Sequence, residues 1–432
     1  MTTPLHRFSL AALSALMLAS CGGSDERSDT SADNGSRKRT LAATSTLAVP
    51  IADEADPLLA GLTIPADAPT RGLWSATQPW PINGLHAALL PNGRVLTYGT
   101  PANTPATQEG RTYDVWTPTL GFGAGSHATS FNAQRVDSFC SAATLLPDGR
   151  LLITGGNAPR ASSVFTTAGS SIATDGPMLA DDRWYATMIT LPDGRPIIVG
   201  GIDPYTEGMV NDPATAIANG QVSMTPELYT PGTGWRALQG ATSRDAFGPD
   251  YLRASYPRAW VGPDGNVVGL SAETLWKLDI NANGGSGATT VLGRFKTPAS
   301  NSAPVNVGAT STAVMYAPGK VLQLGGNGYF NGDGMPASNK ATVIDFNTAT
   351  PTVTETAAMT HARRYPNAVV LPNGQVVVTG GTRVGNNGGA DAVYAAEIWN
   401  PATGTWTLGA SAPLPPCRPP CGTGRAGSRP RR

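Results

Sequence analysis

Charged residues are scarce in this 432-residue chain, at 14% against about 25% in typical domains. Thirty basic side chains balance thirty acidic ones, so the sequence carries no electrostatic footprint for nucleic acid. No phosphate-binding loop, Ser-His-Asp set, paired-carboxylate site or His-Glu-x-x-His motif stands out. The common signatures of nucleotide-binding proteins and hydrolases are therefore missing.

Histidine and cysteine are also scarce, with four copies of each. His86, His127 and His361 are single residues without the spacing of metal ligands, so we interpret them as structural or surface groups. Of the cysteines, only Cys140 lies well inside the body of the chain. A lone cysteine is usually a small buried hydrophobe, so any chemistry at Cys140 must be argued from its surroundings.

The N-terminus reads as a targeting segment. An apolar run from Phe8 to Leu18 ends in Leu-Ala-Ser-Cys, which is typical of a secretory signal and too short for a membrane span. It resembles a bacterial lipobox, which implies cleavage before Cys21 and lipidation of its thiol. The alternative is a plain signal peptide with a chance cysteine. Gly22 after the cysteine favours the outer membrane under the sorting rule for such lipoproteins, so we expect a lipoprotein of the bacterial cell envelope.

Residues 1–20 are thus the predicted lipoprotein signal peptide. Residues 21–72 are polar at first and then rich in Ala and Pro, so they cannot bury enough apolar surface to fold alone. We interpret them as a flexible tether between the lipid and a globular part. That part, residues 73–412, is expected to fold as a monomer.

A repeated pattern fills residues 73–412. Six segments read apolar strand, Pro-Asp/Asn-Gly or similar turn, apolar strand, and most then end in Gly-Gly. Such turns fold two strands back into a hairpin, since Asn/Asp-Gly tolerates positive φ. The turn glycines recur about every 56 residues, close to the period of propeller blades. They are Gly93, Gly149, Gly194, Gly265, Gly319 and Gly374.

The repeat resembles the kelch motif, in which a Gly-Gly pair is followed by an aromatic strand and a distant Trp, here Trp406 in the last repeat. The implied fold is an all-β, kelch-type β-propeller, with six recognisable blades of an expected seven. The alternative is a β-sandwich with recurring turns.

The residues in front of two hairpins carry a more specific resemblance. "SFCSAATLLPDG" places Cys140 just before one hairpin, and "DDRWYATMITLPDG" places Tyr185 at the corresponding point of the next. These motifs resemble the galactose oxidase and glyoxal oxidase family of copper-radical oxidases, closest to its bacterial glyoxal oxidase-like branch. The resemblance implies that Cys140 and Tyr185 are joined by a thioether and that the Tyr185 oxygen binds copper. Arg183 and Trp184 either line this site or pack beside it.

The chemistry of the family explains such a pair. Oxidation of an alcohol or aldehyde removes two electrons, and copper accepts one, so a second one-electron site must adjoin the metal. A phenol with an ortho thioether is easier to oxidise than a free tyrosine. The implied substrates are small alcohols, aldehydes or carbohydrates, and the implied product is hydrogen peroxide.

The sequence departs from the family in its other copper ligands. The family uses a Tyr-His pair and a second histidine from a later β-sandwich, whereas no Tyr-His dipeptide occurs here. Copper(II) prefers a tetragonal set of nitrogen and oxygen ligands, so we expect this chain to be inactive as printed and its copper and Cys-Tyr cofactor to be unassembled. A non-catalytic propeller that binds carbohydrate or protein at the cell envelope is the alternative function, and a decayed gene product is a third.

Residues 413–432 form a Pro/Arg-rich tail without apolar periodicity. Pro413 to Arg418 can be back-translated so that a shifted frame encodes Tyr-His, which suggests a frameshift near codon 413. The alternative is a genuine disordered tail, and the nucleotide sequence decides between them. Cys417 and Cys421 have a C-x3-C spacing that suggests a metal site or a disulfide, but it has no meaning if the frame is shifted.

Overall fold

The computed structural model describes nine stretches of the chain. They are residues 56–104, 107–132, 136–167, 171–174, 178–204, 212–294, 310–327, 335–385 and 389–413. The predicted signal peptide, the lipidation residue Cys21 and the tail cysteines Cys417 and Cys421 lie outside these residues.

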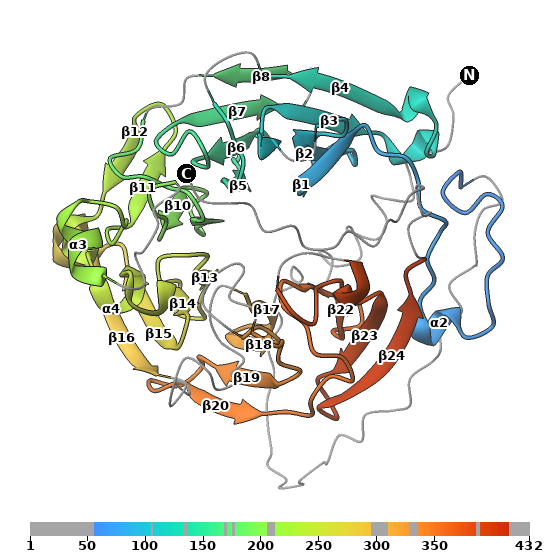
Figure 1. The fold of residues 1–432 in the computed structure, drawn as a ribbon. Helices are drawn as coiled ribbons and strands as arrows, with labels where there is room; N and C mark the ends of the chain where they lie inside the picture. Colours follow the sequence, from blue (N-terminus) through green and yellow to red (C-terminus); the bar gives the residue numbers. More distant parts are fainter. Residues whose placement is uncertain are drawn as a thin grey trace, which may run out of the picture. The chain divides into compact units, whose positions relative to one another are not determined.

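Within the described residues, twenty-four strands form six four-stranded sheets, each built from four strands consecutive in the chain. All pairings within the sheets are antiparallel. Figure 1 shows the six sheets placed around one centre. We number them blade 1 to blade 6 in chain order. This arrangement confirms the predicted β-propeller.

The blades have the following strands. Blade 1 has β1 Ile82–Leu89, β2 Val95–Pro101, β3 Thr112–Trp116 and β4 His127–Phe131; blade 2 has β5 Ala142–Leu145, β6 Leu151–Thr154, β7 Ser162–Thr166 and β8 Ser171–Thr174; blade 3 has β9 Thr187–Thr190, β10 Pro196–Val199, β11 Glu227–Thr230 and β12 Gly234–Ala237. Blade 4 has β13 Arg258–Val261, β14 Val267–Ser271, β15 Thr274–Asp279 and β16 Ala288–Arg294; blade 5 has β17 Thr312–Ala317, β18 Lys320–Leu324, β19 Ala341–Asp345 and β20 Thr352–Glu355; blade 6 has β21 Asn367–Val370, β22 Val376–Thr379, β23 Ala395–Asn400 and β24 Thr405–Ser411.

Helices are short and lie between strands. The α-helices are α2 Ala68–Arg71, α3 Pro213–Ala218, α4 Arg244–Phe247 and α5 Ala282–Gly285, and the 3-10 helices are η3 Pro118–Leu120, η4 Ala124–Ser126, η5 Gln239–Ala241, η6 Asp250–Leu252 and η7 Gly389–Asp391. No helix in the described stretches is long and apolar enough to cross a membrane.

The six predicted hairpins are the first two strands of the six blades. The turn between β9 and β10 shows how the sequence makes them. The Asp193 carboxylate accepts the backbone N–H of Arg195 at 3.0 Å, and Gly194 takes a φ of 84°. A residue with a side chain is strained at that φ, so the turn selects glycine.

The Gly-Gly pair after the second strand allows neighbouring blades to approach closely. A Cβ atom on Gly200 would lie 2.5 Å from the carbonyl oxygen of Ala254, in the segment that leads into blade 4. The Gly201 N–H donates to that same oxygen at 2.7 Å. Both glycines have positive φ, at 63° and 107°. The pair therefore ties blade 3 to the segment that carries the next blade's first strand.

Buried apolar clusters fill the spaces between successive blades. Phe165 belongs to the cluster between blades 1 and 2, Tyr229 to that between blades 2 and 3, and Trp276 to that between blades 3 and 4. Phe346 lies between blades 4 and 5, and Trp399 between blades 5 and 6. Five of the six spaces around the ring are therefore packed like an ordinary protein core.

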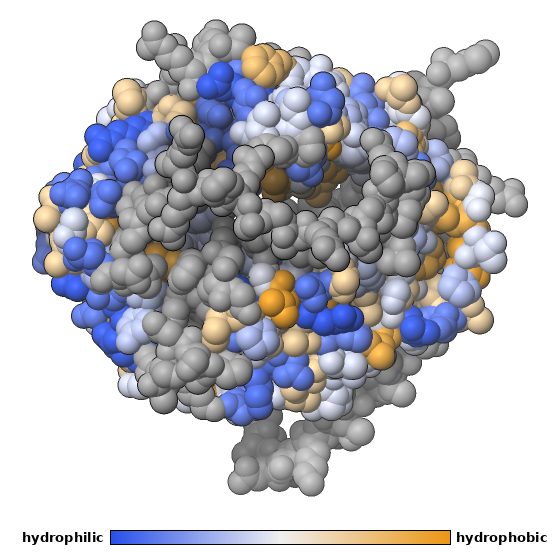
Figure 2. All heavy atoms as spheres, viewed as in Figure 1, coloured by the Kyte–Doolittle hydropathy of each residue, from blue (hydrophilic) through white to orange (hydrophobic). Residues whose placement is uncertain are grey.

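The space between blade 6 and blade 1 is different. Leu85 and Leu89 of β1 are 42% and 68% exposed, and Val369 of β21 is 59% exposed. We call this space the open seam. Figure 2 shows a hydrophobic group at the right edge, where the chain segment before β1 runs in Figure 1. The innermost strands of the first and last blades thus leave apolar side chains in contact with solvent.

One chain segment bridges the open seam. The Arg71 Nε–H donates to the carbonyl oxygen of Leu408 in β24 at 3.2 Å, and the Trp74 indole N–H donates to that of Ala410 at 3.0 Å. Farther along, the Trp80 indole N–H donates to Thr97 Oγ1 in β2 at 2.9 Å. Residues 71–80 are therefore hydrogen-bonded to both blade 6 and blade 1.

Candidate functional site

The residues that lead into the first strands of the blades form a row around one end of the ring. Cys140, Tyr185, Tyr256 and Tyr365 occupy equivalent places before β5, β9, β13 and β21, with φ values of 63°, 59°, 49° and 54°. The N–H of Tyr185 donates to the carbonyl of Cys140 at 3.1 Å, and the N–H of Tyr256 donates to that of Tyr185 at 2.7 Å. Positive φ in bulky residues costs about 1–3 kcal/mol each and is concentrated at functional sites.

The structure brings Cys140 and Tyr185 together, although they are 45 positions apart in the chain. Their side chains are hydrogen-bonded to each other, and the Cys140 thiol is also hydrogen-bonded to Tyr256. The Tyr256 ring lies 4.6 Å from that of Tyr185, and the Trp184 ring stacks on Tyr185 at 3.5 Å. One thiol, two phenols and an indole therefore form a single contact group, which we call the Cys-Tyr cluster.

Burial sets the protonation state of this cluster. Desolvation raises the pKa of the Cys140 thiol from 9.0 to about 12, although hydrogen bonds from Tyr256 and Tyr185 oppose the rise. Burial also raises the pKa of Tyr256 well above its ordinary 10.0. At neutral pH both groups are protonated. A neutral thiol is a weak nucleophile, so Cys140 in this setting does not have the reactivity of a thiolate.

Tyr256 is a member of the cluster that the sequence analysis missed. It stands in "SYPRAW", directly before a recognised hairpin, just as Tyr185 stands in "RWYATM". Alignment of the hairpins was therefore a signal that could have found it. Two residues later, the Arg258 guanidinium lies 5.9 Å from the centre of the Tyr256 ring and donates to the carbonyl oxygen of Ser311 at 2.8 Å.

Arg183 packs inside its blade, which decides between the two interpretations of this residue. Its guanidinium is fully buried and meets the Glu227 carboxylate at 2.8 Å and the Gly200 carbonyl at 2.6 Å. Blade 6 repeats the arrangement with Arg363 and Glu397 at 2.9 Å. The arginine before the tyrosine is thus a structural part of the repeat, whereas Trp184 contacts the cluster.

The described contacts of the three histidines are with residues outside the cluster. His86 of β1 stacks on Tyr98 at 4.6 Å, and burial lowers its pKa from 6.5 to about 4. The His127 Nδ1 atom lies 2.7 Å from a carboxylate oxygen of Asp114, on the outer strands of blade 1. His361 donates its backbone N–H to a carboxylate in blade 6.

A copper ion does not fit the donors found here. Among the described residues, no three His, Cys, Asp or Glu side chains are grouped so that they could hold a metal. The Cys-Tyr cluster offers phenol oxygens and a sulfur but no imidazole nitrogen, whereas copper(II) favours several nitrogen and oxygen ligands in one plane. The described residues therefore do not provide the set of ligands that copper(II) favours.

Comparisons with known proteins agree with this arrangement. A family model described as "Glyoxal oxidase N-terminus" matches residues 102–225, which include both Cys140 and Tyr185, and one described as "Kelch motif" matches residues 363–413. Two proteins called galactose oxidase, both from Gibberella zeae and one from strain PH-1, are 26% identical over 338 residues. The match covers 74% of this chain and 45% of each relative, so the chain spans less than half their length.

Among solved structures, a fungal alcohol oxidase of the AA5 family in complex with copper superposes with a TM-score of 0.62. It is 19% identical, and the match covers 79% of this chain and 68% of that one. At this identity the likeness shows the fold. Together, these findings confirm the predicted resemblance to the galactose oxidase and glyoxal oxidase family and the predicted kelch propeller.

Proposed function

We propose that this chain is the propeller part of a galactose oxidase-like oxidoreductase, in which Cys140 and Tyr185 are the organic half of a redox cofactor. The observation that carries the proposal is their hydrogen-bonded contact inside the segment matched by the glyoxal oxidase model. The reaction class is the oxidation of a small alcohol or aldehyde. Two electrons and two protons leave the substrate, and dioxygen accepts them to give hydrogen peroxide.

The cluster is suited to a crosslink. A thioether would form between Cys140 Sγ and a ring carbon of Tyr185 ortho to the hydroxyl, while the S–H and ring C–H bonds break. Two electrons and two protons leave in this step, and dioxygen is the oxidant that accepts them. The Trp184 ring stacked on Tyr185 restricts the orientations open to the phenol.

Copper is proposed on the resemblance alone, and when bound it would supply the second one-electron site and a Lewis acid. Tyr185 is the residue of this chain that we assign to it. Since the described residues hold no set of histidine ligands, we expect the chain as printed to produce no peroxide from alcohols or aldehydes. Peroxide release that depends on copper and is lost in Tyr185→Phe would contradict this expectation.

The crosslink itself is testable by mass spectrometry. Purified chain is incubated with copper and dioxygen, reduced, alkylated and digested. A joined peptide that contains Cys140 and Tyr185 and lacks two hydrogen atoms relative to the sum of the parts would support the cofactor proposal. Cys140→Ser and Tyr185→Phe should each abolish it. Quantitative alkylation of Cys140 in the copper-treated protein would remove the cofactor proposal for this chain.

A non-catalytic role is the second candidate, and it is favoured because the described residues contain no group of His, Cys, Asp or Glu side chains that could hold a metal ion. In this role, the propeller would bind a carbohydrate or protein at the cell envelope. Glycan binding that needs no copper and is unchanged in Cys140→Ser would support the binding role over the enzymatic one.

We also propose a lipid anchor at Cys21, which would place the propeller at the bacterial cell envelope, at the outer membrane. The proposal rests on the lipobox-like Leu-Ala-Ser-Cys sequence. Cells grown with labelled palmitate should incorporate label into the wild type and none into Cys21→Ser. Equal labelling of both would remove the anchor.

A further inference from the structure

Arg258 is a cation without a counter-ion next to the Cys-Tyr cluster. In the described part of the chain its guanidinium makes one hydrogen bond, to the carbonyl oxygen of Ser311, and it faces no carboxylate. Burial lowers the pKa of Arg258, which shows how poorly the surroundings compensate its charge. An arginine has five N–H donors, so most of them have no protein acceptor here.

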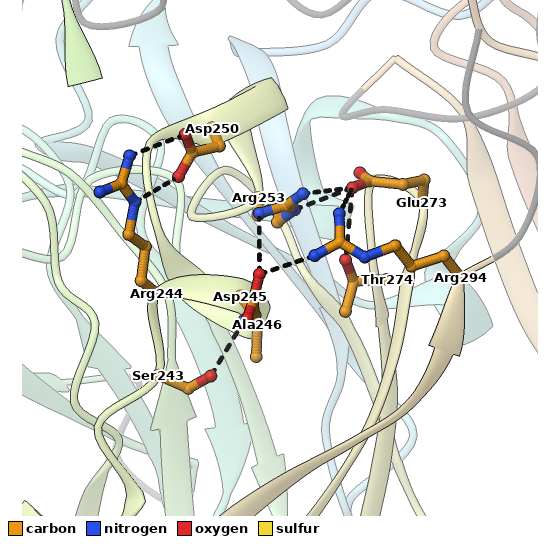
Figure 3. A network of polar contacts seen from close by, with 9 residues as sticks. All are labelled: Ser243, Arg244, Asp245, Ala246, Asp250, Arg253, Glu273, Thr274 and Arg294. Carbon is orange, nitrogen blue, oxygen red and sulfur yellow. Dashed lines mark hydrogen bonds and ion pairs between the residues drawn. The ribbon is translucent and has the colours of Figure 1, made fainter.

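Three other buried arginines of the propeller, Arg183, Arg253 and Arg363, are each paired with a buried glutamate. Figure 3 shows this for Arg253. Arg253 contacts the carboxylate of Glu273, and Asp245 lies 3.7 Å from it. Arg253 and Arg258 are five positions apart in the same loop and strand. Arg258 differs from these three arginines in facing no carboxylate among the described residues.

The unused donors of Arg258 are not fully enclosed. The residue is only partly buried, and its nitrogen atoms are not among the fully enclosed side-chain atoms that lack a hydrogen-bond partner. Burying an unpaired cation is costly, and a group that stays partly accessible while desolvated is ready to accept an anion. The planar fork of the guanidinium matches the two oxygens of a carboxylate.

The position of Arg258 relates this charge to the proposed chemistry. Tyr256 contacts both partners, because its ring lies 5.9 Å from the Arg258 guanidinium carbon and 4.6 Å from the Tyr185 ring. A small molecule held by Arg258 would therefore lie one aromatic ring away from Tyr185.

We infer that Arg258 is the anchor of a subsite for a small carboxylate at this end of the propeller. If the proposed function holds, the molecule oxidised there carries a carboxylate beside its alcohol or aldehyde group, as a small hydroxy acid or oxo acid does. The binding step itself rests on Arg258 and needs neither copper nor the crosslink.

The test uses the copper-free full chain and two probes, glycolate and ethylene glycol, which share a hydroxymethyl group and differ in having a carboxylate or a second alcohol at the other end. Binding is followed by saturation-transfer difference NMR and by the shift in thermal midpoint. Wild type should bind glycolate saturably and ethylene glycol not at all. Arg258→Met should weaken glycolate binding by about 10- to 100-fold, since a hydrogen bond to a charged group is lost. Arg195→Met, in an exposed turn, is the matched control and should bind as wild type does.

The thermal midpoint without ligand distinguishes a binding role of Arg258 from a structural one. Arg258→Met removes a desolvated charge without a carboxylate partner, so the thermal midpoint without ligand should stay or rise. Arg253→Met removes the closest cation from the buried Glu273 and leaves it only the longer contact with Arg294, so the midpoint should fall. Arg258→Lys keeps the charge but not the fork and should bind glycolate more weakly than wild type. Equal binding of glycolate by wild type and Arg258→Met, or of ethylene glycol and glycolate by wild type, would overturn the subsite.

The experiments can reject the proposed oxidase function without rejecting the subsite, and the subsite without rejecting the oxidase function. Cys140→Ser should bind glycolate as wild type does, because the thiol is not a donor to the carboxylate. Retained glycolate binding without any Cys140–Tyr185 crosslink would remove the oxidase function and leave the subsite. A crosslink without glycolate binding would do the reverse.

Discussion

The spaces between successive blades and the open seam between blades 6 and 1 are built from the same repeat but packed differently. In β1 the two situations occur on opposite faces of one strand. Ala88 packs with the cluster between blades 1 and 2, whereas Leu89 points the other way and is 68% exposed. The repeat alone therefore does not decide whether a blade face is buried. What decides it is whether a neighbouring blade is present.

The same contrast bears on how the ring is held. Across the five packed spaces, burial of apolar area supplies the stabilisation, at about 25 cal/mol per Å². Across the open seam, the described connection is the bridge formed by residues 71–80 and its few hydrogen bonds. A net hydrogen bond contributes only about 1 kcal/mol. We therefore expect the open seam to be the weakest part of the ring.

The largest effect is expected in a packed space. Trp276 of β15 is fully buried and fills the room left by Gly269, whose Cβ would lie 2.1 Å from the ring. Trp276→Ala should lower the free energy of unfolding by about 3–5 kcal/mol, because it leaves a cavity between blades 3 and 4. Urea denaturation followed by circular dichroism measures this. A loss below about 1 kcal/mol would show that the packed spaces contribute little to stability and do not differ from the open seam in this respect.

A smaller effect is expected from pH at the first packed space. The buried His86 has a pKa of about 4 when folded and 6.5 as its ordinary value, so unfolding takes up a proton between these values. Stability should be complete above pH 6.5 and fall as the pH drops toward 4, by at most about 1.4 kcal/mol per pH unit.

His86→Gln provides the control for this pH dependence. The free energy of unfolding of both proteins is measured at pH 7, 6 and 5. It should fall with decreasing pH more steeply in the wild type than in the variant. Parallel slopes for the two proteins would show that His86 is not protonated on unfolding in this range.

The sequence predicted the hairpins well because their signal is local. Asp193-Gly194 dictates its turn through one side-chain hydrogen bond and one positive φ. The contact of Cys140 with Tyr185 was predicted from family resemblance, since nothing in the residues between them fixes it. The sequence did not reveal packing between residues that are far apart in the chain. The role of Arg183 could not be assigned, because its partner Glu227 lies 44 positions away, on strand β11.

Tyr256 was missed for a different reason. Its place before a hairpin was visible, but its contact with Cys140 arises from the closeness of blades 2, 3 and 4 at one end of the ring. The lack of a carboxylate at Arg258 was likewise unreadable, because a missing partner shows only when all neighbours are known. Sites made by several blades at once therefore need the structure.

The smallest effect on stability is expected at Leu89. Its comparison with the adjacent Leu90 tests the difference between the open seam and a packed space most directly. Leu89 is 68% exposed at the open seam, and Leu90 is 2% exposed in the cluster between blades 1 and 2. Leu90→Ala should cost about 2–5 kcal/mol, whereas Leu89→Ala should change stability by no more than about 0.5 kcal/mol.

The open seam should matter for association instead. An apolar strand face without a neighbour promotes aggregation, so the wild type should be poorly soluble and Leu89→Ser, with Val369→Ser, should raise the soluble fraction after heating. Light scattering during a thermal ramp gives the readout, and Leu90→Ala is the control that destabilises without changing the seam. If Leu89→Ala proves as destabilising as Leu90→Ala, the Leu89 face is buried in solution, and the open seam is covered by protein that the described residues do not include.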